Sequence, residues 1–111
     1  MDIIFKSKKL EKLFNTEVEL QKKYGKNCAR KIRSRLDDLH AAKTLENLRT
    51  LPGRCHELNG NKSNQLSLDL EHPLRLIFEP SNQDIQRKED GGLDWSLVNA
   101  IKILGVEDTH D

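Results

Sequence analysis

The end of the sequence gathers residues that exchange protons or bind metal ions. Glu107, Asp108, His110 and Asp111 lie within its last five positions. Such a cluster can be a solvated tail, a metal site, or one wall of an active site in which a carboxylate orients an imidazole and raises its pKa. The residues alone leave these three interpretations open.

A metal site is the weakest of the three. Cys55, His56, Asp108 and His110 are of ligand type, but no two ligands have the close spacing of a zinc motif. We therefore expect no metal and no cofactor. Cys28 and Cys55 form no CxxC pair, and without a secretion signal they are expected to be free thiols.

Two further residues could take part in chemistry. Arg75 interrupts the apolar segment LRLIF, 74–78. It fits either the exposed face of an antiparallel sheet or a guanidinium that binds an anion. His56 is either a half-buried strand histidine that donates to a carbonyl or an acid–base group with a pKa near working pH.

Positive and negative charge are unequally distributed along the chain. Residues 1–54 hold 14 Lys and Arg against 7 Asp and Glu, whereas residues 55–111 hold 5 against 11. Lys26, Arg30 and Arg33 recur at helical spacing and form a charged stripe. A basic half indicates contact with nucleic acid or an acidic protein, or simply solvated helix faces.

The first half of the chain has the spacing of helices. A short strand at 2–5 precedes a helix over 8–24, which Ser7 caps and Gly25 ends. The apolar stripe of this helix includes Val18 and continues through Asn15 and Thr16. A second helix, capped by Asn27, runs to 42, and 43–53 is expected to be a short helical turn.

The second half has the pattern of strands. They are expected at 54–60, 64–70, 74–79 and 100–108, the last of them central and covered on both faces. A long polar connection spans 80–98, in which Asp94 caps a turn that packs Trp95 and Val98 on the body. Helices followed by antiparallel strands predict an α+β fold, with the helices on one face of a mostly antiparallel sheet of four to five strands.

Length and composition limit the class of protein. The 111 residues suit a single domain, 1–111. No run of 18 apolar residues and no signal peptide is present, so we expect no membrane partner and a cytoplasmic location.

Three segments in order resemble the HigB branch of the RelE/ParE toxin superfamily. They are LPGRCHELNG at 51–60, NQLSLDLEHPLRLIFEP at 64–80 and VEDTHD at 106–111. The family pattern is LPG-x-x-x-H-x-L-K-G, then W-S-I/V-x-V/L, then W-R-I/L-x-F, and finally V/Y-x-D-Y-H. The resemblance covers essentially the whole chain and implies a small RelE-like fold.

The resemblance also implies an activity and partners. Members of this bacterial family cleave messenger RNA, usually on the ribosome, without a metal. A cognate helix-turn-helix antitoxin silences them, and promoter DNA is bound only through the complex with that antitoxin. In this reaction the 2′-hydroxyl attacks the adjacent phosphate, which requires a base, an acid and positive charge on the phosphorane.

The resemblance assigns catalysis to His56, Arg75, Asp108 and His110. The residues that it and the charge pattern assign to RNA binding are Arg54, Asn59, Lys62, Thr109, Lys22, Lys23, Lys26, Arg30 and Arg33.

The chain also departs from the family pattern. Asn59 replaces a lysine, Thr109 replaces a tyrosine, and Leu66 and Leu74 stand where tryptophan is frequent. The alternative is therefore a protein of this fold with weak or no nuclease activity, which acts by binding an antitoxin or a gyrase-like target. A generic RNA-binding domain is a poorer fit, because one Trp, one Tyr and three Phe offer little surface for base stacking.

Overall fold

The computed structural model describes residues 1–59, 64–82 and 87–108. The N-terminal half contains β1 (Asp2–Phe5), α1 (Lys8–Phe14), α2 (Glu17–Tyr24), α3 (Lys26–Ala41) and the 3-10 helix η1 (Leu45–Thr50). The C-terminal half contains β2 (His56–Glu57), β3 (Leu66–Asp69), β4 (Leu74–Pro80), the 3-10 helix η3 (Trp95–Leu97) and β5 (Ala100–Asp108).

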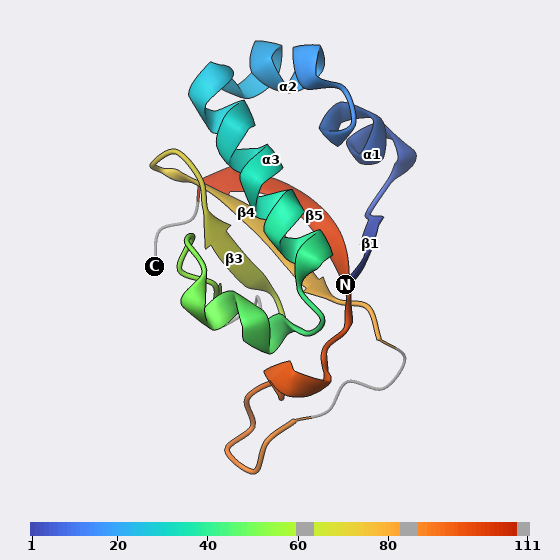
Figure 1. Ribbon diagram of the computed structural model, residues 1–111, viewed down its shortest axis with the longest axis vertical. Helices are drawn as coiled ribbons and strands as arrows, with labels where there is room; N and C mark the ends of the chain where they lie inside the picture. Colours follow the sequence, from blue (N-terminus) through green and yellow to red (C-terminus); the bar gives the residue numbers. More distant parts are fainter. Residues whose placement is uncertain (60–63, 83–86, 109–111) are drawn as a thin grey trace.

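The strands form one five-stranded sheet in the order β1-β5-β4-β3-β2. β1 runs parallel to β5, with Ile3 opposite Ile101, and the other neighbours are antiparallel. In Figure 1, α3 lies across one face of this sheet. The predicted α+β architecture, with helices on one face of a mostly antiparallel sheet, is confirmed.

The core lies between α3 and the alternating apolar residues of the strands. Leu66 and Leu68 of β3 are fully buried, as are Ile32 and Leu39 of α3. Each such side chain contributes about 1.5–3 kcal/mol when it leaves water. The apolar residues of β3 and α3 therefore meet in the core.

The helix predicted over 8–24 is wrong in one respect, because it is two helices. Asn15 ends α1, and Thr16 adopts an extended conformation at the start of α2. The Thr16 hydroxyl donates to the Lys12 carbonyl oxygen at 2.7 Å, in the way that such side chains compete with helical backbone bonds. The break changes the phase of the stripe, so Phe14 is buried while Val18 is 59% exposed.

The predicted caps have mixed outcomes. Ser7 accepts a hydrogen bond from the Leu10 amide at 3.1 Å, which confirms it as the cap of α1. Asn27 does not cap α3: Gly25 holds that position at φ +86°, and Asn27 accepts instead from Arg30 at 2.8 Å. Glycine adopts this left-handed backbone without steric cost, which explains why the helix begins earlier than predicted.

The predicted turn in the long connection is confirmed. Asp94 accepts from the Ser96 amide at 3.1 Å, and Trp95 and Val98 are buried. Glu57 of β2 then accepts a hydrogen bond from the Trp95 indole at 3.1 Å. This connection is thus fastened to the short strand that carries His56.

Two strand predictions require correction. Within the described part of the strand expected at 54–60, residues 54–59, only His56–Glu57 pairs as a strand, and Arg54 before it has φ +48°. β5 is central, as predicted, but only Ile101 and Ile103 on its helix-covered side are fully buried. In the described part of the chain, no helix is long and apolar enough to cross a membrane.

Candidate active site

His56 lies on the sheet face opposite α3. It pairs with Ser67 in the antiparallel register of β2 and β3, while its neighbour Glu57 pairs with Leu66. Successive strand residues point to opposite faces, so His56, Ser67 and Asp69 share the face opposite the helices, whereas Leu66 and Leu68 face the helices. We call the first of these the open face, although Ser67 on it is fully buried.

Two contacts with described residues hold the imidazole of His56. Its Nδ1 is 2.8 Å from the Arg54 carbonyl oxygen, and its Nε2 is 3.4 Å from the Ser67 hydroxyl oxygen. A carbonyl oxygen only accepts, so Nδ1 must be the donor. In the neutral ring Nε2 therefore carries the lone pair, and Nε2 is the atom that can take up or give back a proton.

Arg54 holds its carbonyl in this position through an unusual backbone conformation. Its φ of +48° lies in the left-handed region, which costs a non-glycine residue about 1–3 kcal/mol. Gly53 before it has φ +113°, and a Cβ there would lie 2.8 Å from the Nε of Arg35. The tight LPG turn thus depends on a glycine and directs the Arg54 carbonyl toward His56.

Asp69 brings two arginines together. Its carboxylate accepts from the Arg54 Nε at 2.6 Å and lies 3.3 Å from the Nε of Arg75, the residue opposite it on β4. The Arg54 side chain is 67% exposed, whereas that of Arg75 is only 17% exposed. Because exposed ion pairs are weak, Arg54 is the cation that a ligand can detach more easily.

The main chain of Asp69 is also held. Its amide donates to the Gly53 carbonyl at 2.7 Å, and its carbonyl accepts from the Nε of Arg35 on α3 at 2.9 Å. These bonds connect the LPG turn, α3 and β3 at the point where the arginines meet.

A small cleft of about 80 Å³ opens beside the arginines. It is lined by Arg54, Asp69, Leu70, His72, Pro73, Leu74 and Arg75. His72, predicted as a surface residue in a turn, is exposed as expected and also borders this cleft. The cleft can admit a small anionic group between two guanidinium side chains and an imidazole.

β5 contributes acidic residues to the same region. Glu107 lies opposite Arg75 in the register, and Asp108 lies opposite Leu74. By strand alternation Glu107 shares the open face with Arg75, whereas the Asp108 side chain starts from the other face. The strand register therefore places Glu107 opposite the predicted anion-binding arginine, Arg75, and places Asp108 one position further along β5.

The remaining predicted residues lie elsewhere. Asn59 is exposed beyond β2. Lys22 and Lys23 on α2 and Lys26, Arg30 and Arg33 on α3 are exposed in the helical layer, away from the open face. Lys62, Thr109 and His110 lie outside the described residues.

Sequence analysis missed Ser67 and Asp69, and it named Glu107 only as a member of the terminal acidic cluster. Ser67 and Asp69 are the polar residues of an alternating strand, and the short turn at 71–73 sets Asp69 opposite Arg75. A short turn between two strands fixes which residues lie opposite each other, and this was the signal in the sequence that could have identified Asp69 as the neighbour of Arg75. The position of Glu107 opposite Arg75 depends on the register of β4 with β5, which contains a bulge that the sequence does not reveal.

The structure also places the cysteines and the possible metal ligands among the described residues. Among the described residues, no three His, Cys, Asp or Glu side chains come together as a metal site. Cys28 and Cys55 are free thiols, and burial raises the pKa of Cys55 to about 12. At neutral pH Cys55 is therefore protonated and a poor nucleophile.

The fold has relatives among solved structures. YoeB in its complex with YefM from Staphylococcus aureus has a TM-score of 0.58 and 16% identity, over 99% of this chain and 98% of that one. The YoeB/ParE toxin from Agrobacterium tumefaciens has a TM-score of 0.59 and 9% identity, over 99% and 100%. Identities this low support a common fold and nothing finer.

A family model gives the assignment. No curated protein matches the chain. The model for HigB-like toxins, the RelE-like toxins of type II toxin–antitoxin systems, matches residues 3–89 and so includes His56 and Arg75 but ends before β5. Because this match spans most of the sequence, the chain belongs to the HigB-like toxin family of type II toxin–antitoxin systems.

Proposed function

We propose that this toxin is a metal-independent endoribonuclease that cleaves messenger RNA on the ribosome in the bacterial cytoplasm. The observation that carries the proposal is the open sheet face on which His56, Arg54 and Arg75 lie together. Nε2 of His56 takes the proton of the 2′-hydroxyl as that oxygen attacks phosphorus. The arginines stabilise the negative charge of the phosphorane.

The leaving 5′-oxygen needs a proton. We assign that step to His110, by its likeness to the terminal histidine of the family pattern, with Asp108 orienting it. The bond from phosphorus to the 5′-oxygen breaks, the oxygen takes up the proton, and a 2′,3′-cyclic phosphate remains. Lys22, Lys23, Lys26, Arg30 and Arg33 would contact ribosomal RNA phosphates, an attraction that salt weakens.

The proposed partner is a small helix-turn-helix antitoxin that silences the toxin. The complex of the two proteins would bind its own promoter DNA, and the toxin alone would not. The two solved complexes of YoeB with YefM are of toxin and antitoxin, which supports this kind of partner.

One observation favours a second candidate, a toxin that binds its target without cutting RNA. The Asp69 carboxylate occupies both arginines, and Asn59 stands where the family has a lysine. Both features reduce the positive charge available to a phosphate. In this case the protein would act on an antitoxin or a gyrase-like target.

The test is induced expression in a bacterium with mapping of mRNA 5′ ends. The wild type is expected to stop growth and to produce new in-frame 5′ ends. His56→Ala with His110→Ala is expected to remove both effects and keep the circular dichroism spectrum. Full toxicity in this double variant would contradict the assignment, and growth arrest without cuts would favour the second candidate.

A further inference from the structure

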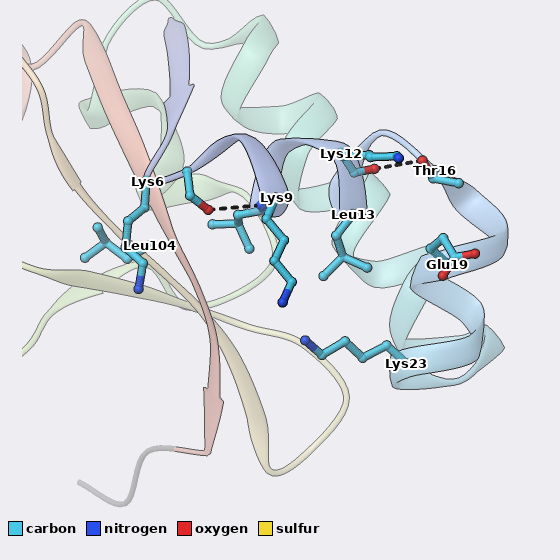
Figure 2. Close-up of a pocket in the computed structure, with 10 residues that line it drawn as sticks. Lys6, Lys9, Lys12, Leu13, Thr16, Glu19, Lys23 and Leu104 are labelled. Atoms are coloured by element: carbon cyan, nitrogen blue, oxygen red, sulfur yellow. Dashed lines mark hydrogen bonds between the residues drawn. The ribbon is translucent and has the colours of Figure 1, made fainter.

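A groove lies between the first two helices and the end of β1, at the opposite edge of the sheet from β2 (Figure 2). Its volume is about 590 Å³. The lining residues are Lys6, Ser7, Lys9, Leu10, Lys12, Leu13, Thr16, Glu19, Lys23 and Leu104. We call it the lysine groove.

Its rim is strongly basic. It carries four lysines and one acidic residue, Glu19, which lies 4.0 Å from Lys22 outside the groove. In Figure 2 the side chains of Lys9 and Lys23 extend toward one another from α1 and α2. Among the described residues, none of the four lysines of the groove forms a salt bridge. The rim can therefore receive carboxylates or phosphates.

Its floor is aliphatic. Leu10 and Leu13 of α1 and Leu104 of β5 line it, and each is only partly buried. None of the described lining residues is aromatic. RNA bases gain their contact energy by stacking on aromatic rings, so the leucines give RNA no advantage. Apolar side chains of a protein, in contrast, gain free energy when they cover this floor.

We propose that the lysine groove binds an acidic amphipathic helix of a partner protein. Apolar residues at positions i, i+3, i+4 and i+7 of that helix cover Leu10, Leu13 and Leu104. Glutamate and aspartate residues along its flanks pair with Lys6, Lys9 and Lys23 across the groove.

This surface is separate from the candidate active site. Lys6 and α1 lie beside β1, whereas His56 lies on β2 at the far edge of the sheet, with three strands between them. A helix in the lysine groove therefore leaves His56 and Arg75 uncovered. The proposal does not depend on nuclease activity, although the groove shares Lys23 with the proposed contact to ribosomal RNA.

The experiment measures binding of labelled peptides to the full chain by fluorescence anisotropy. The probe is a peptide of about 18 residues of Glu, Leu and Ala with leucine at the helical spacing. The comparison probes are a scrambled peptide of identical composition and a short single-stranded RNA. The wild type is expected to bind the patterned peptide at least about tenfold more tightly than the scrambled one.

Two matched double variants locate the binding. Lys6→Glu with Lys9→Glu reverses two charges in the groove and is expected to raise the Kd of the patterned peptide about tenfold or more. Lys8→Glu with Lys43→Glu makes the same change at exposed lysines that do not line the groove, and should leave the Kd within about twofold.

Several outcomes would overturn the proposal. They are absence of peptide binding, equal binding of the two peptides, and equal weakening by the two double variants. Displacement of the peptide by RNA would identify the groove as a nucleic-acid surface instead. A change in the sedimentation of the groove variant without peptide would identify it as an interface between copies of this chain.

Discussion

Asp69 sets how much of the positive charge of Arg54 and Arg75 is available to a bound phosphate. Its carboxylate lies within 3.3 Å of both Nε atoms. A phosphate in the adjacent cleft must compete with this internal anion. Asp69 therefore both positions the arginines and weakens their attraction for RNA.

Asp69→Asn is expected to separate these two effects. The amide oxygen still accepts from one arginine, but the negative charge is gone. We expect RNA to bind about fivefold more tightly and the free energy of unfolding to fall by about 1 kcal/mol. Anisotropy with single-stranded RNA and urea unfolding measure the two quantities.

Glu79→Gln is the matched control for this change. Glu79 also pairs with a cation across the open face, Lys102 at 3.4 Å, but lies away from the arginines. It should alter RNA affinity much less than Asp69→Asn. Equal gains from the two variants would mean that total charge, and not the arginine pair, controls binding.

Among the elements, the connection between β4 and β5 is held through Glu57. Glu57 accepts from the Trp95 indole at 3.1 Å and lies 3.3 Å from the Leu93 amide nitrogen. The Arg49 guanidinium stacks over the Trp95 ring at 4.1 Å. These contacts connect η1, η3 and β2, so the strand that positions His56 depends on a segment far away in sequence.

Glu57→Ala is expected to loosen this connection. The indole and amide groups lose their acceptor, which should lower the free energy of unfolding by about 1–3 kcal/mol. The chain has one tryptophan, so the fluorescence of Trp95 reports the change directly. We expect a red-shifted emission and stronger quenching by acrylamide.

Glu57→Gln provides the comparison, since its amide oxygen can still accept from the indole. It should keep most of the wild-type emission. If Glu57→Ala left both emission and quenching unchanged, the hydrogen bond would not be what holds Trp95 in place.

The sequence predicted most elements correctly and failed where two local signals competed. Alternating leucines identified β3, and helical spacing identified α3. Because the apolar stripe continues past Asn15 and Thr16, one continuous helix was predicted over 8–24, although the side chains of these two residues favour helix ends. The residue pattern singled out His56 and Arg75 and the family resemblance assigned them to catalysis, whereas the Asp69 contact required the register of two strands.

For the whole molecule, burial of three weak acids limits stability at alkaline pH. Burial raises the pKa of Tyr24 above its ordinary value of 10.0 and the pKa of Cys28 above 9.0, and it raises that of Cys55 from 9.0 to about 12. The unfolded chain therefore loses these protons first as the pH rises. The stability that the protonated groups contribute is complete below pH 9 and is lost above it.

The resulting prediction concerns the slope of stability against pH. Between pH 9 and about 12, the Cys55 thiol is protonated in the folded state and deprotonated in the unfolded state. Over this range, each unit of rising pH should therefore lower the free energy of unfolding by up to about 1.4 kcal/mol through Cys55. Urea unfolding at several pH values measures this slope. Cys55→Ala should have a smaller slope over this range and the same slope as the wild type near pH 7. Identical slopes throughout would contradict the assigned burial effect.

The lysine groove could not be predicted from the sequence, because strand pairing brings its residues together from distant parts of the chain. Nine of its ten lining residues lie between positions 6 and 23, but Leu104 comes from β5. It reaches them because β1 pairs in parallel with β5. The composition of the chain shows that its N-terminal half is basic, but only the fold shows that Leu104 joins Leu10 and Leu13 beneath the lysines.

That parallel pairing also has a consequence for biosynthesis. β1 is synthesised before the other described strands, whereas its neighbour in the sheet, β5, is synthesised after them. β1 therefore stays without this partner until residues 100–103, which pair with it, have been made. A prematurely terminated product that lacks β5 would leave β1 and β4 without the strand between them.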